Sequence, residues 1–394
     1  MTQRDALLCH PVRTAIGTYG GSLKGTPATT LGATVIGETL RRAGLSGDAV
    51  QSVIMGNVIQ AGNRMNPARV AAVSGGLPVE VPALTVNRVC GSGAQAIVSA
   101  ALEIWSGMTD CTVAGGMENM DQAPYLMAQG RWGARMGDTS LFDSMLMDGL
   151  NDAFSQKHAG WHTEDLVSRH AISRQDQDRW AARSQQQFSR AQEAGHFDAE
   201  IVPIELQGRK GATLFQRDEH NRGDVTEESL AGLRPAFRKD GTITAGNAPG
   251  LNSGAAAMIV ADSAFAESHG LSPMARLVAF GISGVDPDYF GIGPVPAVQQ
   301  AMQRAGWSLA DIDRVEINEA FAAIALACLR ELGMDPDIVN PEGGAIAHGH
   351  PIGATGAVLT TRLLHAMQRN GERRGIVTLC IGGGQGIALA LERL

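Results

Sequence analysis

The sequence predicts an α/β protein built from two similar halves, and two observations carry this prediction. Residues 40–57, "LRRAGLSGDAVQSVIMGN", resemble residues 302–319, "MQRAGWSLADIDRVEINE". Both stretches read as a helix ended by glycine, a turn led by serine, and a strand. A second pair follows in the same order, because small residues open a helix after Cys90 and again after Pro351. Two pairs of similar segments in the same order favour duplication of a βαβα unit, with helices covering each sheet.

The ends of the repeated units can also be placed. The strand after the first of these helices is expected to end at Gly115 and Gly116, and its counterpart at Gly382–Gly384. Between the halves the chain becomes rich in Arg, Gln, Asp and His, with a helix capped by Ser173 and ended by Gly195. We expect an N-terminal half over residues 1–120 and 247–269, an inserted loop domain over 121–246, and a C-terminal half over 270–394.

Composition excludes several classes of protein. The 394 residues are 44% hydrophobic with a net charge of −8, which disfavours nucleic acid and anionic membranes as partners. The five cysteines lie far apart without a CxxC pair, which argues against a disulfide framework and for a reducing compartment. The N-terminus lacks the apolar core of a signal peptide, and no apolar run is long enough to span a membrane. We therefore expect a cytoplasmic protein.

Cys90, in "NRVCGSGAQAIVSAALEIW", has three interpretations. As a lone cysteine it is favoured as a small buried residue. A dinucleotide loop is a weak interpretation, because "CGSGAQA" lacks the third glycine of the fingerprint. If Cys90 lies at a strand-to-helix turn, the helix dipole should lower its pKa and make a thiolate available as a nucleophile.

Three further motifs hold residues suited to chemistry. In "GGAIAHGHPIGATG", the glycines and Pro351 fix a loop that can aim His350, whereas no carboxylate or CxxC joins His348 and His350 in a metal-ligand set. In "TLCIGGGQGIA", Cys380 ends a strand before glycines whose N–H groups suit an oxyanion or phosphate; a tight turn with a buried cysteine is equally compatible. In "EINEAFAAIALACLR", Asn318 alone reads as a helix N-cap, and Cys328 as packing.

Taken together, "NRVCGSGAQA", "NEAFA", "GGAIAHGHPIGATG" and "CIGGGQG" resemble the four active-site signatures of the thiolases. The resemblance covers nearly the whole chain, from "PVRTAIGTYGGSL" through "GRKG", "LRPAF" and "TAGNAPGLNSGAA". It implies two βαβαβαββ halves stacked as five layers, α-β-α-β-α, with an inserted loop domain. It also implies acyl transfer between CoA thioesters through a cysteinyl thioester, with no cofactor and no metal.

The resemblance assigns the catalytic roles. Cys90 is expected to carry the acyl group, with His350 as its base and Cys380 as the second acid/base. Asn318 would hold a water that forms one oxyanion hole with His350. The N–H groups of Cys90 and Gly382 would form the other oxyanion hole.

The resemblance also assigns contacts to acyl-CoA and CoA. Arg222 is expected to stack on the adenine, in a basic group with Arg209, Lys210 and Arg217, and Ser229 and Phe237 to contact the pantetheine. His158 would lie close to the thioester. The remaining candidate binding residues are Ala159, Ala245, Pro249, Phe290 and Phe321.

Departures from the family pattern bear on the substrate. Pro249 stands where many members have serine, so a hydroxyl contact to CoA is missing. Ala159 stands where acetyl-specific members commonly have methionine, in "HAGWHTEDL" rather than "HMG-TAEN". We expect a larger acyl pocket, which Trp161 or Phe290 could refill, and tolerance for chains longer than acetoacetyl.

Two alternatives remain open from the sequence, a ketoacyl synthase-type condensing enzyme and a non-catalytic CoA- or lipid-binding relative. A nicotinamide dehydrogenase lacks the required fingerprint. The resemblance implies a homo-oligomer, most often a tetramer of tight dimers. The stretch "RWGARMGDTSLFDSML" is a candidate for the tetramer contact.

Overall fold

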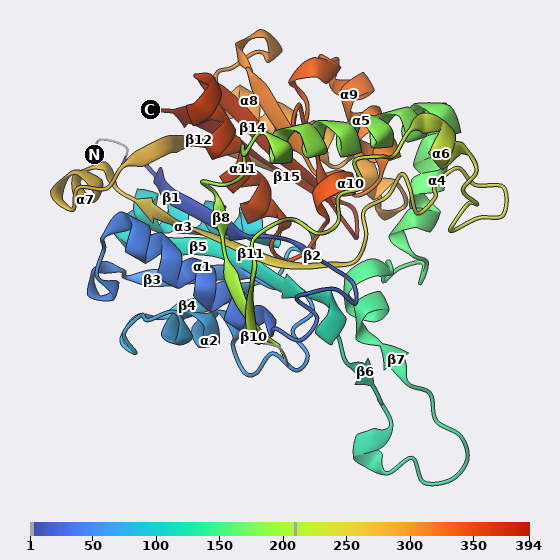
Figure 1. Cartoon of the computed structure of the whole chain (residues 1–394), viewed down its shortest axis with the longest axis horizontal. Helices are drawn as coiled ribbons and strands as arrows, with labels where there is room; N and C mark the ends of the chain where they lie inside the picture. The colour runs from blue at the N-terminus through green and yellow to red at the C-terminus, as the bar shows by residue number, and fades with distance from the viewer. Residues whose placement is uncertain (1–3, 209–210) are drawn as a thin grey trace.

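The computed structural model describes residues 4–208 and 211–394 (Figure 1). Arg209 and Lys210, two members of the expected basic group, lie outside the described residues. The helices are α1 (Ala28–Ala43), α2 (Pro67–Ser74), α3 (Ser92–Ser106), α4 (Ala159–Arg169), α5 (Arg174–Glu193), α6 (Glu227–Ala231), α7 (Ser263–Ser268), α8 (Pro294–Ala305), α9 (Ala322–Leu332), α10 (Ala345–His348) and α11 (Thr355–Asn370).

The strands form one hydrogen-bonded path in the order β13-β14-β15-β12-β1-β11-β5-β3-β4, with β2 on β11 and β8 on β1. Two small hairpins, β9–β10 and β6–β7, stand apart. The strands are β1 (Leu7–Thr14), β2 (Gly17–Thr18), β3 (Ser52–Gly56), β4 (Ala83–Val86), β5 (Cys111–Asn119), β6 (Tyr125–Leu126), β7 (Phe142–Asp143), β8 (Ile201–Val202), β9 (Ile204–Gly208), β10 (Gly211–Phe215), β11 (Asn252–Ala261), β12 (Pro273–Gly284), β13 (Arg314–Ile317), β14 (Arg374–Ile381) and β15 (Gln385–Arg393).

The pairing pattern confirms the duplication. In the first half, β3 and β5 are parallel, and β5–β11 and β11–β1 are antiparallel. In the second half, β13 and β14 are parallel, and β14–β15 and β15–β12 are antiparallel. The equivalent strands β1 and β12 pair with each other where the halves meet. The boundaries expected for the three parts of the chain stay a prediction.

Three buried clusters show how the layers stack. One lies between α1–α2 and the first-half strands, and another between α8–α9 and the second-half strands. The third surrounds α3 and α11, which are covered by strands on both sides. Side chains of β15 alternate accordingly, since Leu389 faces the central helices while Ala388 and Ala390 face α8 and α9. The fold is therefore the predicted α-β-α-β-α arrangement.

Local signals placed most element ends correctly. α1 and α8 end at Gly44 and Gly306, both left-handed with φ of 61° and 70°, where glycine avoids the Cβ clash. The Ser173 hydroxyl accepts from the Asp176 N–H and begins α5, and Gly195 follows its C-cap. The expected end of one strand was wrong, because β5 runs past Gly115 and Gly116 to Asn119 with every residue buried.

The segment between the halves contributes α4–α6 and a long projecting loop. Figure 1 shows α5 lying across the upper face, and the loop that carries β6 and β7 extending away from the body. The core strand expected after this segment is β11, which lies between β1 and β5. Within the described ranges, no helix has the length and apolar character needed to cross a membrane.

Candidate active site

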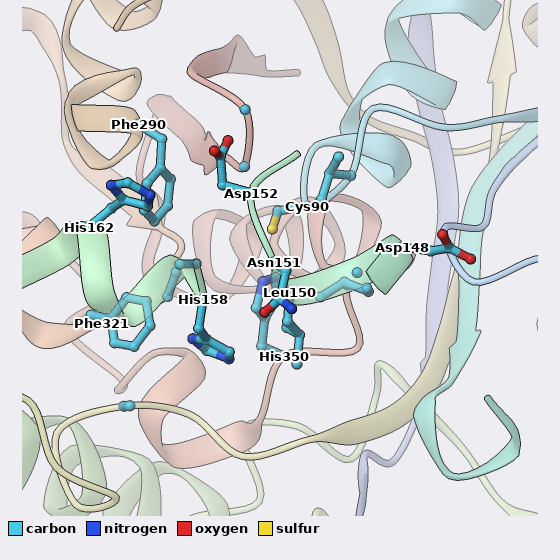
Figure 2. Close-up of a pocket in the computed structure, with 18 of the residues that line it drawn as sticks. Cys90, Asp148, Leu150, Asn151, Asp152, His158, His162, Phe290, Phe321 and His350 are labelled. Atoms are coloured by element: carbon cyan, nitrogen blue, oxygen red, sulfur yellow. The ribbon is translucent and has the colours of Figure 1, made fainter. Parts of the chain in front are cut away.

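A cavity of about 420 Å³ lies where both halves and the intervening segment meet. Cys90 reaches it from the first half, His350 and Gly382 from the second, and His158 from the N-terminus of α4 (Figure 2). Most of the wall is apolar, so the few polar groups dominate the electrostatics inside. Its larger apolar side chains are Val89, Met120, Met147, Leu150, Phe237, Leu251, Phe290, Phe321 and Ile352.

Cys90 lies in a tight turn between β4 and α3, as predicted. The residue before it, Val89, has a φ of +46°, which is sparsely populated for a β-branched residue and costs about 1–3 kcal/mol. Ser92 holds this turn, because its hydroxyl accepts from the Arg88 N–H at 2.8 Å and donates to the Val89 carbonyl at 2.7 Å. The strained backbone presents the cysteine at the cavity.

The expected low pKa of Cys90 was wrong for the resting protein. Burial raises the pKa of the Cys90 thiol to about 11. Hydrogen bonds from the backbone N–H groups of Gly382 and Cys90 oppose this shift, and the charge of Glu118 adds to it. Desolvation thus outweighs the N–H groups and the helix terminus. The thiol is neutral near pH 7, so a base must accept its proton during attack.

His350 has the protonation state of such a base. Its Nδ1 lies 2.7 Å from the Thr355 hydroxyl, whose own hydrogen is donated to the Pro351 carbonyl at 2.9 Å. Thr355 must therefore accept from His350, which places the proton on Nδ1 and leaves Nε2 as an acceptor. Burial lowers the pKa of His350 to about 4, so the ring is neutral near pH 7. Its backbone N–H donates to Asn252 on β11 at 2.8 Å, which fixes the loop.

Asn318 and Cys380 lie behind this surface. The Asn318 amide nitrogen donates to His350 Nε2 at 3.3 Å, while its Oδ1 is buried without a hydrogen-bond partner within the described ranges. The N-cap interpretation of Asn318 was wrong, because α9 is capped at Phe321. Burial, and next the neighbouring Cys90 thiol, raise the pKa of Cys380 well above its ordinary value. Cys380 is fully buried. Because the pKa values of Cys90 and Cys380 are both raised, both thiols are neutral at rest.

Most of the expected acyl and pantetheine contacts line the cavity. His158 stacks on Phe237 with ring centroids 4.6 Å apart, and Phe237 meets Phe321 edge-on at 5.9 Å. The His158 Nδ1 accepts from the Gly160 N–H at 3.0 Å, which leaves Nε2–H as the donor of the neutral ring. Ala159, Pro249 and Phe290 also lie on the cavity wall.

Other expected contacts lie away from this cavity. Arg222, Ser229 and Ala245 are exposed and do not line it. Ser229 instead caps α6 reciprocally with Thr226. Arg217 lines a separate surface cavity of about 410 Å³.

Trp161 does not occupy the space that Ala159 leaves in the acyl pocket. Its ring lies under the Arg238 guanidinium at 4.5 Å and the Lys157 ammonium at 5.2 Å, and it is not part of the cavity wall. Of the two aromatic residues considered for that space, Phe290 is the one that lines it.

Sequence reasoning missed one wall of the cavity and one buried carboxylate. The wall is formed by the end of a π-helical turn, η4 (Met145–Leu150), and by the residues that follow it. Its signal was the apolar run "SMLMDGL" within an otherwise polar segment. The carboxylate is Glu118, fully buried at the end of β5. Its signal was a lone charge within a core strand.

Comparisons with known proteins agree with this geometry. The model of the thiolase N-terminal domain matches residues 7–264, and that of the thiolase C-terminal domain matches residues 271–393. The beta-ketothiolase BktB of Cupriavidus necator is 52% identical, covering 99% of this chain and 100% of its own. An acetyl-CoA acetyltransferase of Pseudomonas aeruginosa is 50% identical, with coverage of 99% and 100%.

Solved structures show the same fold. The acetyl-CoA acetyltransferase of Bacillus anthracis superposes with a TM-score of 0.97 at 43% identity, covering 100% of this chain and 99% of its own. Human mitochondrial 3-ketoacyl-CoA thiolase has a TM-score of 0.97 at 42% identity, with both chains fully covered. These relatives favour an active transferase over the ketoacyl synthase and non-catalytic alternatives. The chain therefore belongs to the thiolase family and is an acyltransferase.

Proposed function

We propose that the protein catalyses the reversible thiolysis of 3-ketoacyl-CoA through an acyl-Cys90 intermediate, the reverse being Claisen condensation with acetyl-CoA. One observation carries the proposal. A neutral thiol and an imidazole with an unprotonated Nε2 line one cavity, and the N–H groups of Gly382 and Cys90 are directed at the sulfur. This combination suits covalent catalysis on a thioester or ketone carbon.

In the first half-reaction, His350 Nε2 takes the Cys90 proton as Sγ attacks the 3-keto carbon. The bond between C2 and C3 breaks, and its electron pair leaves as the enolate of acetyl-CoA. Cys380 donates its proton to that carbon, which suits a buried thiol held neutral by a raised pKa. The products are acetyl-CoA and an acyl thioester on Cys90.

In the second half-reaction, the Cys380 thiolate takes the proton of incoming CoA. The CoA sulfur attacks the acyl carbon, and the Cys90 thiolate leaves and regains its proton from His350. Every group then returns to its resting state, so ping-pong kinetics follow.

Two donor sets support the oxyanions. We place one oxygen against the N–H groups of Gly382 and Cys90, which already hydrogen-bond the sulfur position. For the other we propose a water held by Asn318 beside His350, because the buried Asn318 Oδ1 needs a partner. Loss of one such donor typically costs about 2.7–4 kcal/mol of transition-state stabilisation.

Binding and assembly complete the proposal. CoA thioesters would serve as substrates without a further cofactor, with His158, Phe237 and Phe321 along the pantetheine and Arg222, Ser229 and Ala245 farther out. A homo-oligomer, most simply a tetramer, is supported by apolar residues on the projecting loop, since Trp132 and Met136 are 82% and 96% exposed. Five free cysteines support a reducing, cytoplasmic setting.

Replacing Ala159 with methionine is expected to shift preference toward short acyl chains. Ala159 lines the cavity at the start of α4, so a longer side chain would occupy acyl space. One methylene of mismatch in an apolar pocket changes kcat/KM by about 10–200-fold. We therefore expect Ala159→Met to lose at least about tenfold in kcat/KM for C8 relative to C4 3-ketoacyl-CoA. A thiolysis panel of increasing chain length measures this ratio.

The same panel tests the proposed function. Ala194→Met, at the exposed C-cap of α5, is the matched control and should leave the chain-length profile unchanged. No cleavage of any 3-ketoacyl-CoA would reject the function. A wild-type preference for C4 over longer chains would reject only the larger pocket.

Replacing Cys380 with alanine is expected to separate the two chemical roles. Acylation of Cys90 by acetyl-CoA uses His350 to take the Cys90 proton and Cys380 only to protonate the departing CoA sulfur. A thiolate is a far better leaving group than a carbanion, so the acylation rate should stay within about tenfold of wild type. Thiolysis needs the Cys380 proton at the departing carbon and should fall by about 10²–10⁴-fold. Rapid-quench detection of acetyl-enzyme gives the first rate and steady-state thiolysis the second.

The matched control is Cys328→Ala, which removes another fully buried thiol, one that contacts the Gly291 carbonyl. It should leave both rates close to wild type. Equal losses in acylation and thiolysis for Cys380→Ala would contradict the separate role.

A further inference from the structure

We propose that Glu118 is a positioning residue that sets the His350 loop against Cys90, and that it does so only as a carboxylate. The inference rests on the proposed function. Glu118 lies at the end of β5, fully buried, and none of the steps above uses it. Its oxygens contact two segments, one after β3 and one just past His350, so a single carboxylate joins the two halves beside the cavity.

The contacts are specific. Glu118 Oε2 accepts from the Gly353 N–H at 3.0 Å and from the Val58 N–H at 3.0 Å. Glu118 Oε1 accepts from the Asn57 side-chain amide at 2.8 Å and from the Ile59 N–H at 3.4 Å. Gly353 shares a loop with His350, so this carboxylate ties the base to the first half.

Glycines let the Gly353 peptide reach Glu118. A Cβ at Gly56, the last residue of β3, would lie 2.6 Å from the Gly353 carbonyl oxygen, and a Cβ at Gly116 would collide with the same atom. A Cβ at Gly353 itself would lie 2.7 Å from Glu118 Oε2. The loop thus enters a slot with no room for a side chain, and the carboxylate closes it.

The helices that follow the two catalytic groups meet at the same place. A Cβ at Gly93, in the first turn of α3, would lie 2.6 Å from the Ala357 nitrogen in the first turn of α11. A small shift of the Gly353 loop therefore changes where α11 and His350 lie relative to Cys90. A misplacement of about 1 Å can lower a rate about 10²-fold.

The surroundings require the ionised form of Glu118. All four partners are hydrogen-bond donors, so a proton on either oxygen would face an N–H group and break a contact. Two titratable groups belong to the segments that meet at this carboxylate. They are the Cys90 thiol, in the turn before α3, whose pKa the charge of Glu118 raises, and the His350 imidazole, on the same loop as Gly353. Neither supplies a positive charge near pH 7, since both are neutral.

Burial and hydrogen bonding shift the pKa of Glu118 in opposite directions, so the carboxyl ionises near neutral pH. Burial raises the pKa of Glu118 to about 7, although the four hydrogen bonds favour the charged form. As pH falls through this value the carboxylate gains a proton, the Gly353 contact weakens, and acylation should slow. His350, with a pKa of about 4, contributes no acid limb in that range.

The test is single-turnover acylation of Cys90 by S-acetyl-pantetheine, which carries no phosphate to titrate, followed by intact-protein mass. Wild type should show an acid limb with an apparent pKa of about 7. Glu118→Gln keeps the shape but turns an amide NH₂ toward two donors. Acylation of Cys90 in this variant should be about 100-fold slower than in wild type at pH values above that pKa, and the acid limb should be missing. Glu103→Gln, at a half-buried carboxylate of α3 bonded to hydroxyls, should keep both rate and limb.

Asn57→Ala keeps the test decisive if Glu118→Gln does not fold. It removes one donor to the charged form, so the acid limb should move to higher pH. An acid limb that persists unchanged in Glu118→Gln, or does not move in Asn57→Ala, overturns the proposal, as does a pH-independent wild type. Absence of acyl-Cys90 in the wild-type protein at every pH would instead reject the proposed function.

Discussion

Cys90→Ala is expected to abolish acyl-enzyme formation and to lower thiolysis at least about 10⁴-fold, because removing a nucleophile from a catalytic group costs up to about 10⁶ in kcat. The cavity and its oxyanion donors remain, so substrate should still bind. Cys90→Ser should lose nearly as much, because the serine hydroxyl is far less acidic than a thiol and the neutral His350 is a weak base. Intact mass after mixing with acetyl-CoA detects the intermediate, and thiolysis of acetoacetyl-CoA gives the rate.

Cys111→Ala is the matched control, because Cys111 is fully buried on β5 and belongs to the cluster beneath α1 and α2. It should lose stability but keep acylation and turnover. Wild-type-like turnover in Cys90→Ser, or a stable acyl group on another residue, would contradict the assignment.

A variant at Val89 tests whether the strained turn positions Cys90. Since Val89 adopts φ of +46°, Val89→Gly should relax the turn, and any loss in acylation then reports on positioning rather than on the thiol.

The sequence was sufficient for features set by local chemistry. Glycines with left-handed conformations ended α1 and α8 where expected, and Ser173 began α5. The two pairs of similar segments predicted the duplication, since equivalent local patterns give equivalent strand and helix orders. The motif resemblance also predicted that Cys90, His350 and Gly382 belong to one site, and they line one cavity although they lie far apart along the chain.

Features set by burial and distant contacts could not be read in this way. The low pKa expected for Cys90 assumed that the helix terminus dominates, whereas burial outweighs it. The end of β5 was placed too early because its glycines suggested a turn. They serve instead for close approach, Gly115 to β11 and Gly116 to the Gly353 peptide. Glu118 acquires one of its partners, the Gly353 N–H, only when a loop from the second half enters the slot.

Arg13→Met is expected to cost about 3–5 kcal/mol of folding stability, because it leaves buried carboxylates without their cation. Arg13, on β1, is fully buried. Its Nε donates to Glu200 at 2.7 Å, and its two terminal nitrogens donate to Asp218 at 2.8 and 2.9 Å. Burial alone would lower the pKa of Arg13, but the two carboxylates outweigh it and hold that pKa above its ordinary value.

The position of this ion cluster makes the loss consequential. Glu200 precedes β8, which pairs with β1, and Asp218 also accepts from the Ile16 N–H at 2.8 Å. The cluster therefore fixes both ends of the β9–β10 hairpin onto the first half. Arg41→Ala is the matched control, since Arg41 is 71% exposed and pairs with Glu38 on the helix surface. Such exposed pairs contribute at most about 1 kcal/mol.

A charge-compensated variant separates electrostatics from packing in this cluster. Arg13→Met leaves the buried Asp218 and Glu200 carboxylates without their cation. Adding Asp218→Asn and Glu200→Gln should recover much of the stability, because no uncompensated charge then remains buried. Denaturant unfolding of the single and triple variants measures this difference, and a triple variant less stable than Arg13→Met would show that shape, not charge, dominates.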